Sequence, residues 1–249
     1  KRRSMNNTYA EVFATVLGEN QIKINEPMSR HTTFGIGGPA DCFLIPKTAE
    51  ELCIVTRLAY KYGMPVFVLG GGANLLVRDK GIRGVVIFTG RLQKIEQNDN
   101  LLKVSSGVST AQAARAAYDS GLSGMEFASG IPGTIGGAAY MNAGAYGGEM
   151  SKIIVSATTC DRKGDLITYD SRDIRYSYRH SLFMENGEVI VDITLSLKPG
   201  NKKDIKALMD DLNNRRRTKQ PLEKRSAGST FKRPDGHFVG QMIEELSLK

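Results

Sequence analysis

The sequence predicts a protein of the α+β class. Strand and helix patterns alternate in its first half, strand patterns dominate its middle, and a long helical pattern follows Pro199 and Gly200. A chain of 249 residues can bury a sizeable core and can hold two or three small domains. The sequence contains no internal repeat and no low-complexity tract.

Two helices are marked by their capping residues. Thr48 and Glu51 have the spacing of a capping box, and apolar residues at helical spacing follow as far as Gly63. Ser109 begins a second, alanine-rich helix that Gly121 ends. Glycine suits a helix end because it adopts a left-handed backbone without steric cost.

Short apolar runs between turn signals predict the strands. These runs are Asp41–Lys47, Val66–Leu69, Val85–Thr89, Leu101–Gly107 and Val189–Lys198. Two more β-rich runs, between Lys152 and Asp170, flank Asp161-Arg-Lys-Gly164, which is typical of a hairpin turn. A third helix is expected over about 201–217, with an apolar face formed by Ile205, Leu208, Met209 and Leu212.

Composition excludes several classes of protein. The chain is 41% hydrophobic and 24% charged, and no apolar run reaches the ~18 residues of a membrane span. Lys1-Arg2-Arg3 is not followed by a continuous apolar region, so the N-terminus does not resemble a signal peptide. Cys42, Cys53 and Cys160 are odd in number and widely spaced. They argue against a disulfide framework and a metal site, and they favour a reducing cytoplasm.

Positive charge is concentrated at the end of the sequence. The net charge is +8, and residues 198–249 hold 13 Lys and Arg against 7 Asp and Glu. A solvated basic surface, a nucleic-acid partner and an anionic small substrate all fit this excess. No aromatic residue interleaves with Arg215–Arg217, and no nucleic-acid motif is present. A phosphorylated small molecule is therefore the favoured partner.

The first glycine-rich segment, Gly70-Gly71-Gly72-Ala73-Asn74-Leu75, directly follows a predicted strand. Three glycines permit positive φ angles and let backbone N–H groups approach a phosphate closely. The segment is not a dinucleotide fingerprint, because Leu75 occupies the place of the third glycine and no helix pattern follows. It is not a Walker A loop either, and an ordinary turn remains an alternative.

The second glycine-rich stretch strengthens the case for a ligand. Residues 121–148 hold nine of the 27 glycines, separated by apolar and small residues. Glycine is entropically costly to order, so a dense ordered run of it indicates backbone packed against a ligand. Close packing of strands is the structural alternative.

The segment Ser226-Ala-Gly-Ser229-Thr-Phe-Lys232 suggests an active site. Small residues allow a tight turn that exposes a hydroxyl, and Lys232 adds a positive charge nearby. A hydroxyl that can release a proton beside an anion-binding cation is a catalytic arrangement. Taken alone, however, a serine is more often a cap or turn residue.

Together with His31–Asp41, these motifs resemble the UDP-N-acetylenolpyruvoylglucosamine reductase family from about Asn25 to Lys249. The resemblance implies the FAD-binding PCMH-type fold shared with vanillyl-alcohol oxidase and sugar-lactone oxidases. Residues 1–92 and 93–199 would be the two FAD-binding subdomains, and 200–249 a small α+β substrate domain. The resemblance also implies NADPH-dependent reduction of a UDP-sugar enolpyruvyl ether to UDP-N-acetylmuramate, for peptidoglycan synthesis. The expected protein is a cytoplasmic monomer without metal, nucleic-acid or membrane partners.

The resemblance also implies roles for individual residues. Arg179 matches the arginine that binds the substrate carboxylate, and Ser229 matches the proton donor. Tyr178, Arg216, Gln220 and Lys232 match positions that line the UDP-sugar side. The first loop offers Ala73 and Asn74 where covalent flavoproteins of this fold have a histidine, so non-covalent FAD is expected. The implied FAD-binding residues are Gly70, Gly71, Gly72, Ala73, Asn74, Leu75, Gly130, Ile131, Pro132, Gly133, Thr134, Gly136, Gly137, Ala138, Asn142, Gly144 and Ala145.

The sequence departs from the family at one catalytic position. The family's catalytic glutamate belongs to a segment beyond Lys249, and neither Glu244 nor Glu245 matches it. A non-catalytic nucleotide-binding protein therefore stays open as a function. Another FAD oxidoreductase of the same fold, such as a sugar or lactone oxidase, is a second alternative.

Overall fold

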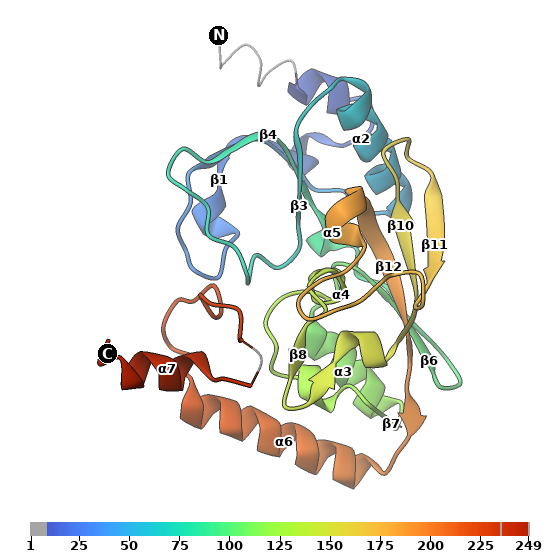
Figure 1. The fold of residues 1–249 in the computed structure, drawn as a ribbon. Coiled ribbons are helices and arrows are strands. Elements are labelled where there is room, and N and C mark those ends of the chain that lie inside the picture. Colours follow the sequence, from blue (N-terminus) through green and yellow to red (C-terminus); the bar gives the residue numbers. More distant parts are fainter. Residues whose placement is uncertain (1–8, 235, 249) are drawn as a thin grey trace.

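The structure of the protein is a computed structural model that describes residues 9–234 and 236–248. Two β-sheets with their helices form most of the molecule, and the helix α6 (Lys202–Lys219) runs along one end (Figure 1). The N-terminal residues Lys1-Arg2-Arg3, and the prediction that no signal peptide begins there, lie outside the described residues.

The first sheet has the strand order β1-β2-β4-β3. β1 pairs antiparallel with β2, whereas β2 and β3 both pair in parallel with β4. Helix α2 (Ala49–Lys61) links β2 to β3 and buries Leu52, Val55 and Ala59. The strands are β1 (Ile22–Pro27), β2 (Pro39–Leu44), β3 (Val66–Leu69) and β4 (Ile82–Phe88). The first glycine segment thus begins where β3 ends.

The second sheet has the order β11-β10-β12-β6-β5, and its neighbouring strands are all antiparallel. The predicted hairpin turn at Asp161–Gly164 is confirmed, because it joins β10 to β11 and Gly164 has a φ of 85°. The strands are β5 (Ile95–Asn98), β6 (Leu101–Ser105), β10 (Ile154–Cys160), β11 (Leu166–Asp170) and β12 (Val189–Ser196).

Shorter elements connect and cover these sheets. Further helices are α3 (Thr110–Asp119), α4 (Ile135–Tyr140), α5 (Phe183–Asn186) and α7 (Val239–Glu245). Two small sheets pair β7 (Leu122–Ser123) with β13 (Lys198–Pro199), and β8 (Gly144–Ala145) with β9 (Gly148–Glu149). The 3-10 turns are η1 (Glu19–Gln21), η2 (Met28–Arg30), η3 (Thr89–Arg91), η4 (Glu126–Ala128) and η5 (Met150–Lys152).

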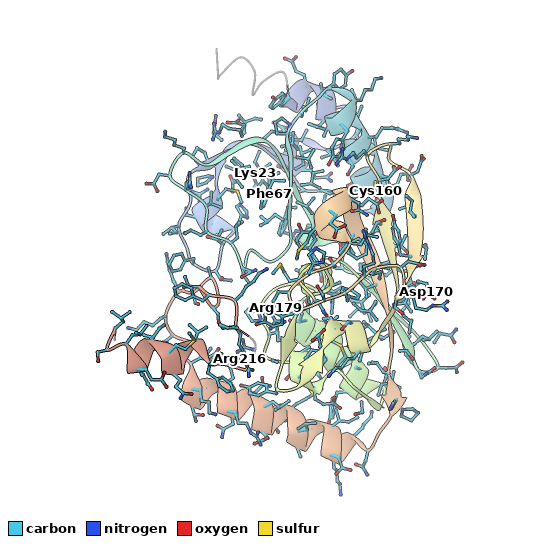
Figure 2. The ribbon with its side chains drawn as sticks, in the orientation of Figure 1. Lys23, Phe67, Cys160, Asp170, Arg179 and Arg216 are labelled. Atoms are coloured by element: carbon cyan, nitrogen blue, oxygen red, sulfur yellow. The ribbon has the colours of Figure 1, made fainter. Side chains whose placement is uncertain are left out.

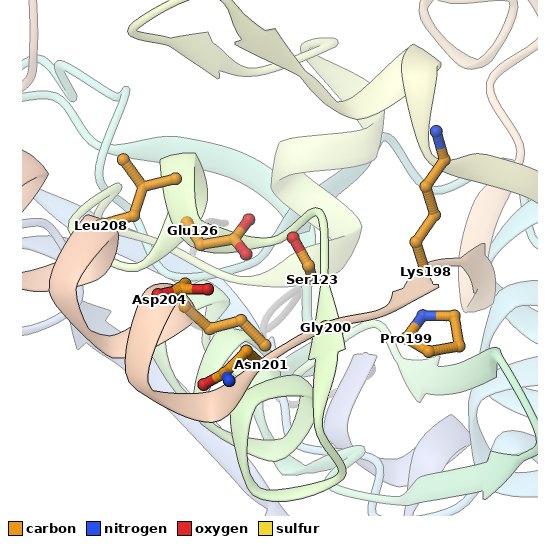
Figure 3. Close-up of a pocket in the computed structure, with 9 residues that line it drawn as sticks. Ser123, Glu126, Lys198, Pro199, Gly200, Asn201, Asp204 and Leu208 are labelled. Carbon is orange, nitrogen blue, oxygen red and sulfur yellow. The ribbon is translucent and has the colours of Figure 1, made fainter.

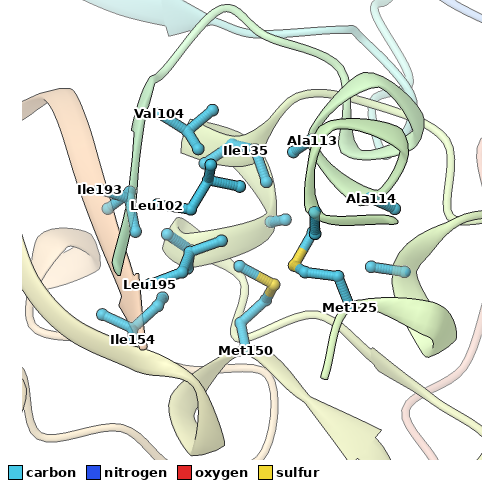
Figure 4. Close-up of a cluster of buried hydrophobic side chains, with 14 of the residues drawn as sticks. Leu102, Val104, Ala113, Ala114, Met125, Ile135, Met150, Ile154, Ile193 and Leu195 are labelled. Atoms are coloured by element: carbon cyan, nitrogen blue, oxygen red, sulfur yellow. The ribbon is translucent and has the colours of Figure 1, made fainter. Parts of the chain in front are cut away.

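The largest hydrophobic cluster lies between the second sheet and helices α3 and α4. Leu102 and Leu195 extend from β6 and β12 toward Ala113 and Ile135 of these helices (Figure 4). A second cluster packs α2 on the first sheet, and it also contains Cys160, Val189 and Val191 of the second sheet. The two sheets therefore share a core, which holds the segments between them in place.

Most predicted elements are confirmed, with differences in one cap, in the ends of strands and on one helix face. The strands predicted to reach Gly107 and Lys198 end at Ser105 and Ser196. Thr48 caps α2, but the carboxylate of Glu51 accepts from the backbone N–H of Lys47 and from Gln21 instead of closing a capping box. The strand predicted to reach Lys47 ends at Leu44. Leu208 is 46% exposed, because α6 packs through the stripe of Ile205, Met209 and Leu212, and position 208 lies beside that stripe.

Candidate functional site

The two glycine-rich segments lie against each other. A Cβ atom on Gly71 would lie 2.7 Å from Cα of Gly133, and one on Gly70 would lie 2.6 Å from Oγ1 of Thr134. Non-bonded carbon atoms normally approach to about 3.5–4.0 Å. Glycine therefore allows a backbone contact that a side chain at Gly71 would prevent. β3 delivers the first segment, and the second leads into α4.

A third segment, around His31, packs on the first glycine loop. Gly72 has a φ of 62°, and a Cβ atom there would lie 2.0 Å from the carbonyl oxygen of His31. The His31 ring stacks on Phe43 with a centroid distance of 4.3 Å. The segment is thus fixed to the first sheet and presents its backbone to Gly72.

Glu26 holds this segment through a hydrogen bond with His31. Its Oε1 lies 2.8 Å from Nε2 of His31, and the residue is 8% exposed. Burial acts to raise the pKa of Glu26, but the hydrogen bond from His31 and the charge of Lys23 outweigh it, so the pKa lies below its ordinary value. The carboxylate therefore stays charged, and it orients the His31 ring.

The first glycine loop has backbone donors available for a ligand. Within residues 9–234 and 236–248, no group accepts a hydrogen bond from the backbone N–H of residues 71–74. Successive unpaired N–H groups in a loop with a positive φ form a concavity that binds anions. A pyrophosphate is such an anion, so the residues present fit the predicted FAD. Ala73 and Asn74 offer no side chain that forms a covalent flavin link.

Arg179 is anchored at the Asn142–Ala145 segment. Its Nη1 donates to the carbonyl of Asn142 and its Nη2 to that of Gly144, each at 3.0 Å. It has a φ of 54° in a tight turn between Ser177 and His180, and its guanidinium lies over the Tyr178 ring at 4.9 Å. A non-glycine residue with positive φ is uncommon, and it marks a side chain held in a specific position.

Asn142 organises the same region through its side chain. The residue is fully buried and has a φ of 43°. Its Nδ2 donates to the carbonyl of Ser177 at 2.9 Å and to Glu149, and its Oδ1 accepts from the N–H of Ser151. The amide is thus engaged in holding the Arg179 turn, and its predicted contact with FAD stays a prediction.

The serine-rich segment lies beside the first glycine loop. The Thr33 hydroxyl donates to the carbonyl of Ser226 at 2.6 Å, and Arg225 donates to the carbonyl of Gly35 at 3.3 Å. A Cβ atom on Gly228 would lie 3.6 Å from Oδ1 of Asn74. Residues from the two ends of the sequence therefore meet at one place.

The two serines of this segment have different environments. The Ser226 hydroxyl accepts from the backbone N–H of Gly228 at 3.1 Å, which is the arrangement of a turn residue. The Ser229 side chain is exposed and makes no hydrogen bond with any residue of the described ranges, 9–234 and 236–248. Ser229 is thus the serine with a free hydroxyl.

Helix α6 brings the predicted UDP-sugar residues to the second glycine segment. A Cβ atom on Gly130 would lie 3.3 Å from Cδ of Arg216. Burial lowers the pKa of Arg216 from its ordinary value, while Tyr146 acts in the opposite direction. Gln220 accepts from Nε of Arg216 at 3.1 Å. Figure 2 places Arg216 below Arg179, on the side of the molecule where α6 lies.

One predicted substrate residue, Tyr178, is contacted by the C-terminal segment, which carries another, Lys232. The Tyr178 hydroxyl accepts from the backbone N–H of Arg233 at 3.3 Å. Lys232, the preceding residue, is exposed and forms no hydrogen bond or ion pair with the part of the chain that the structure describes. The structure thus joins Tyr178 to the segment that carries Ser229 and Lys232, although no contact places Lys232 itself.

A separate hollow of about 330 Å³ lies at the start of α6 (Figure 3). It is lined by Ser123, Glu126, Lys198, Pro199, Gly200, Asn201, Asp204, Ile205 and Leu208. None of these residues belongs to the predicted site. The glycine loops, the Arg179 turn and the serine segment meet elsewhere, so this hollow does not define the function.

Sequence reasoning missed one residue at this meeting point. Thr33 contacts both the first glycine loop and the serine segment, yet it carries no motif of its own. The available signal was its position in His31-Thr-Thr-Phe-Gly, a polar run before the glycines at 35, 37 and 38.

No helix in the described part of the chain is long and apolar enough to cross a membrane.

Comparisons with known proteins match this chain to a family model and to named relatives. A family model described as an FAD binding domain matches residues 40–170. The UDP-N-acetylenolpyruvoylglucosamine reductase of Exiguobacterium sibiricum is 47% identical, over 94% of this chain and 77% of that protein. The enzyme of the same name from Clostridium kluyveri is 45% identical, over 97% of this chain and 79% of that protein.

Solved structures show the same fold. UDP-N-acetylenolpyruvylglucosamine reductase (MurB) from Thermus caldophilus superposes with a TM-score of 0.78 at 31% identity, covering 92% of this chain and 80% of that one. An alkyldihydroxyacetonephosphate synthase has a TM-score of 0.60 at 16% identity, covering 78% of this chain and 44% of that one, so it shares the fold alone.

These findings confirm the predicted α+β fold of the FAD-binding type, the FAD cofactor and the class of FAD-dependent oxidoreductase. The identity and coverage are high enough to decide the family as well. The chain belongs to the UDP-N-acetylenolpyruvoylglucosamine reductase family.

Proposed function

We propose that the chain reduces UDP-N-acetylenolpyruvoylglucosamine to UDP-N-acetylmuramate, with NADPH as the reductant. The observation that carries this proposal is the position of the serine segment beside the first glycine loop, through Thr33 and Asn74. A reduction of a carbon–carbon double bond needs a proton donor close to the redox cofactor. The names of the relatives supply the substrate.

The predicted FAD residues divide between two glycine segments. Gly70–Leu75 would hold the pyrophosphate through the backbone N–H groups of residues 71–74. Gly130–Ala138, with Asn142, Gly144 and Ala145, would contribute to the same FAD site, since Gly133 contacts Gly71. When bound, FAD supplies the two-electron chemistry that amino-acid side chains lack.

Arg179 would bind the substrate carboxylate. Two of its five N–H donors bond to the carbonyls of Asn142 and Gly144, which orients the guanidinium and leaves donors for a ligand. A fixed guanidinium grips a carboxylate in a fork and stabilises negative charge as it grows beside it. Because the side chain is already held in place, little conformational entropy is lost on binding.

Ser229 would donate the proton that completes the reduction. Its exposed hydroxyl has no hydrogen-bond partner among residues 9–234 and 236–248, whereas the Ser226 hydroxyl is engaged in a turn. Tyr178, Arg216, Gln220 and Lys232 would bind the UDP-sugar. The charge of Arg216 suits a diphosphate, and its contact with Gly130 supports a place for the diphosphate near the flavin.

The same proposal includes the organisation of the chain. Residues 1–92 and 93–199 would form the two FAD-binding subdomains and 200–249 the substrate domain, since the sheets divide near residue 92 and α6 begins at Lys202. We place the enzyme in the cytoplasm, because Cys42, Cys53 and Cys160 are all free thiols. A monomer is part of the same proposal.

Rapid mixing separates the two halves of the reaction and tests the role of Ser229. In Ser229→Ala, NADPH should still bleach the flavin absorbance at the wild-type rate, because that step needs no proton for the sugar. Recovery of the absorbance on adding UDP-N-acetylenolpyruvoylglucosamine should slow about 10²–10⁴-fold. Ser226→Ala is the matched control and should retain both rates.

Two results would contradict the proposal. Equal loss of both rates in Ser229→Ala would make Ser229 structural, and a selective loss in Ser226→Ala would move the proton donor to that residue. Recovery of the absorbance with oxygen alone, and none with the enolpyruvyl substrate, would favour an oxidase of the same fold.

A further inference from the structure

Thr33 joins two parts of the site that lie far apart in sequence. Its backbone N–H donates to the carbonyl of Gly72 at 3.1 Å, and its hydroxyl donates to the carbonyl of Ser226 at 2.6 Å. Gly72 belongs to the loop that would hold FAD, and Ser226 belongs to the segment that carries Ser229. One residue therefore bonds to the cofactor loop with its backbone and to the serine segment with its side chain, whose hydroxyl also lies 3.5 Å from the Gly72 carbonyl.

The residues before Thr33 hold it in a defined position. His31 is held by the stack on Phe43 and by Glu26. Thr32 is buried, and its hydroxyl donates to the carbonyl of Ile36 at 2.9 Å. A hydroxyl carried by such an anchored turn is a fixed donor for the serine segment.

The serine segment, in contrast, has few attachments. Residues 228–234 are exposed, and the contacts with the first subdomain run through Thr33, Asn74 and the bond from Arg225 to Gly35. A segment with little buried surface is readily displaced. The hydrogen bond from Thr33 is therefore one of the few contacts that hold this segment at the cofactor loop.

We propose that Thr33 is a positioning residue that couples FAD binding to the placement of the Ser229 segment. A ligand on the N–H groups of residues 71–74 would hold Gly72 in place, and the bonds of Thr33 to Gly72 and to Ser226 would carry this constraint to the serine segment. By linkage, an ordered serine segment strengthens FAD binding by the same factor. A single net hydrogen bond corresponds to a coupling of about fivefold. The inference rests on the FAD site described above.

Limited trypsin digestion measures this coupling. Cleavage after Lys224 and Arg225 reports on the serine segment, and cleavage after Lys163, in the remote hairpin turn, is the internal reference. Saturating FAD should slow the first relative to the second in the wild type. Thr33→Val removes the donor with little change of shape, and it should reduce this protection about fivefold.

Conservative and remote variants complete the test. Thr33→Ser keeps a hydroxyl and should restore the protection, whereas Thr168→Val, on the outer hairpin, should behave as the wild type. FAD affinity is measured separately by flavin fluorescence. If the wild type does not bind FAD, the assignment of the FAD site is wrong. FAD binding with full protection in Thr33→Val would overturn the coupling alone. Loss of all FAD binding in Thr33→Val but not in Thr33→Ser would make the hydroxyl a direct ligand, which also refutes a positioning role.

Discussion

Replacing Gly71 with alanine would insert a methyl group between the two glycine segments. The new Cβ would lie 2.7 Å from Cα of Gly133, whereas carbon atoms need about 3.5 Å, so the two backbones would have to separate by close to 1 Å. Neither contact atom is the end of a flexible side chain, so no rotamer change relieves the clash. Gly71 is also not among the residues with positive φ, so the effect isolates close packing from backbone strain.

The cost of such overpacking is about 1–3 kcal/mol. In a chain of this size that lowers Tm by roughly 2–4 °C for each kcal/mol. If the clash is relieved by separation of the two glycine segments that would hold FAD, the same free energy weakens FAD binding by about 5- to 150-fold. Thermal unfolding without FAD measures the part of this cost that falls on the stability of the fold. A fluorescence titration with FAD measures the part that falls on cofactor binding.

Gly240→Ala is the matched control for this change. A Cβ atom at Gly240 meets nothing within 4 Å, and the residue lies inside α7. Alanine there should leave FAD binding unchanged and should not lower Tm, because alanine favours the helix. If Gly71→Ala binds FAD as tightly as Gly240→Ala and melts at the wild-type temperature, the two glycine segments do not pack in close contact at Gly71 and Gly133.

Three further predictions follow from the same structure. Since the pKa of Glu26 lies below its ordinary value of 4.5, its charge stabilises the fold above that pH, and the contribution is lost as the pH falls through the folded-state pKa. Glu26→Gln should therefore lower Tm at pH 7, and its Tm should fall less steeply than that of the wild type as the pH is lowered. If Tm falls with pH as steeply in the variant as in the wild type, Glu26 does not have this role. Leu195→Ala empties a fully buried position and should cost about 2–5 kcal/mol in urea unfolding, whereas Leu166→Ala, at a position 56% exposed, should cost far less. Acid precipitation of the holoenzyme should release FAD into the supernatant, and yellow colour kept in the pellet would refute non-covalent binding.

Local chemistry made much of the fold predictable. Helix α3 begins after Ser109 and ends before Gly121, and the hairpin turn at Asp161–Gly164 lies where the turn residues place it. Caps and turns depend on residues three or four positions apart, so the sequence carries them directly. The glycine segments and the Ser229 motif likewise indicated the family, because such runs are local patterns with specific chemistry.

The tertiary structure decided which of these segments meet. Thr33 and Ser226 are 193 positions apart, and their hydrogen bond exists because the first sheet and the C-terminal segment are brought together. Arg179 bonds to the carbonyls of Asn142 and Gly144 for the same reason. Periodicity placed Leu208 on the apolar face of α6, but the surface that α6 contacts leaves that position exposed. Local pattern determines which element a residue joins, whereas contact between distant segments depends on how the whole chain packs.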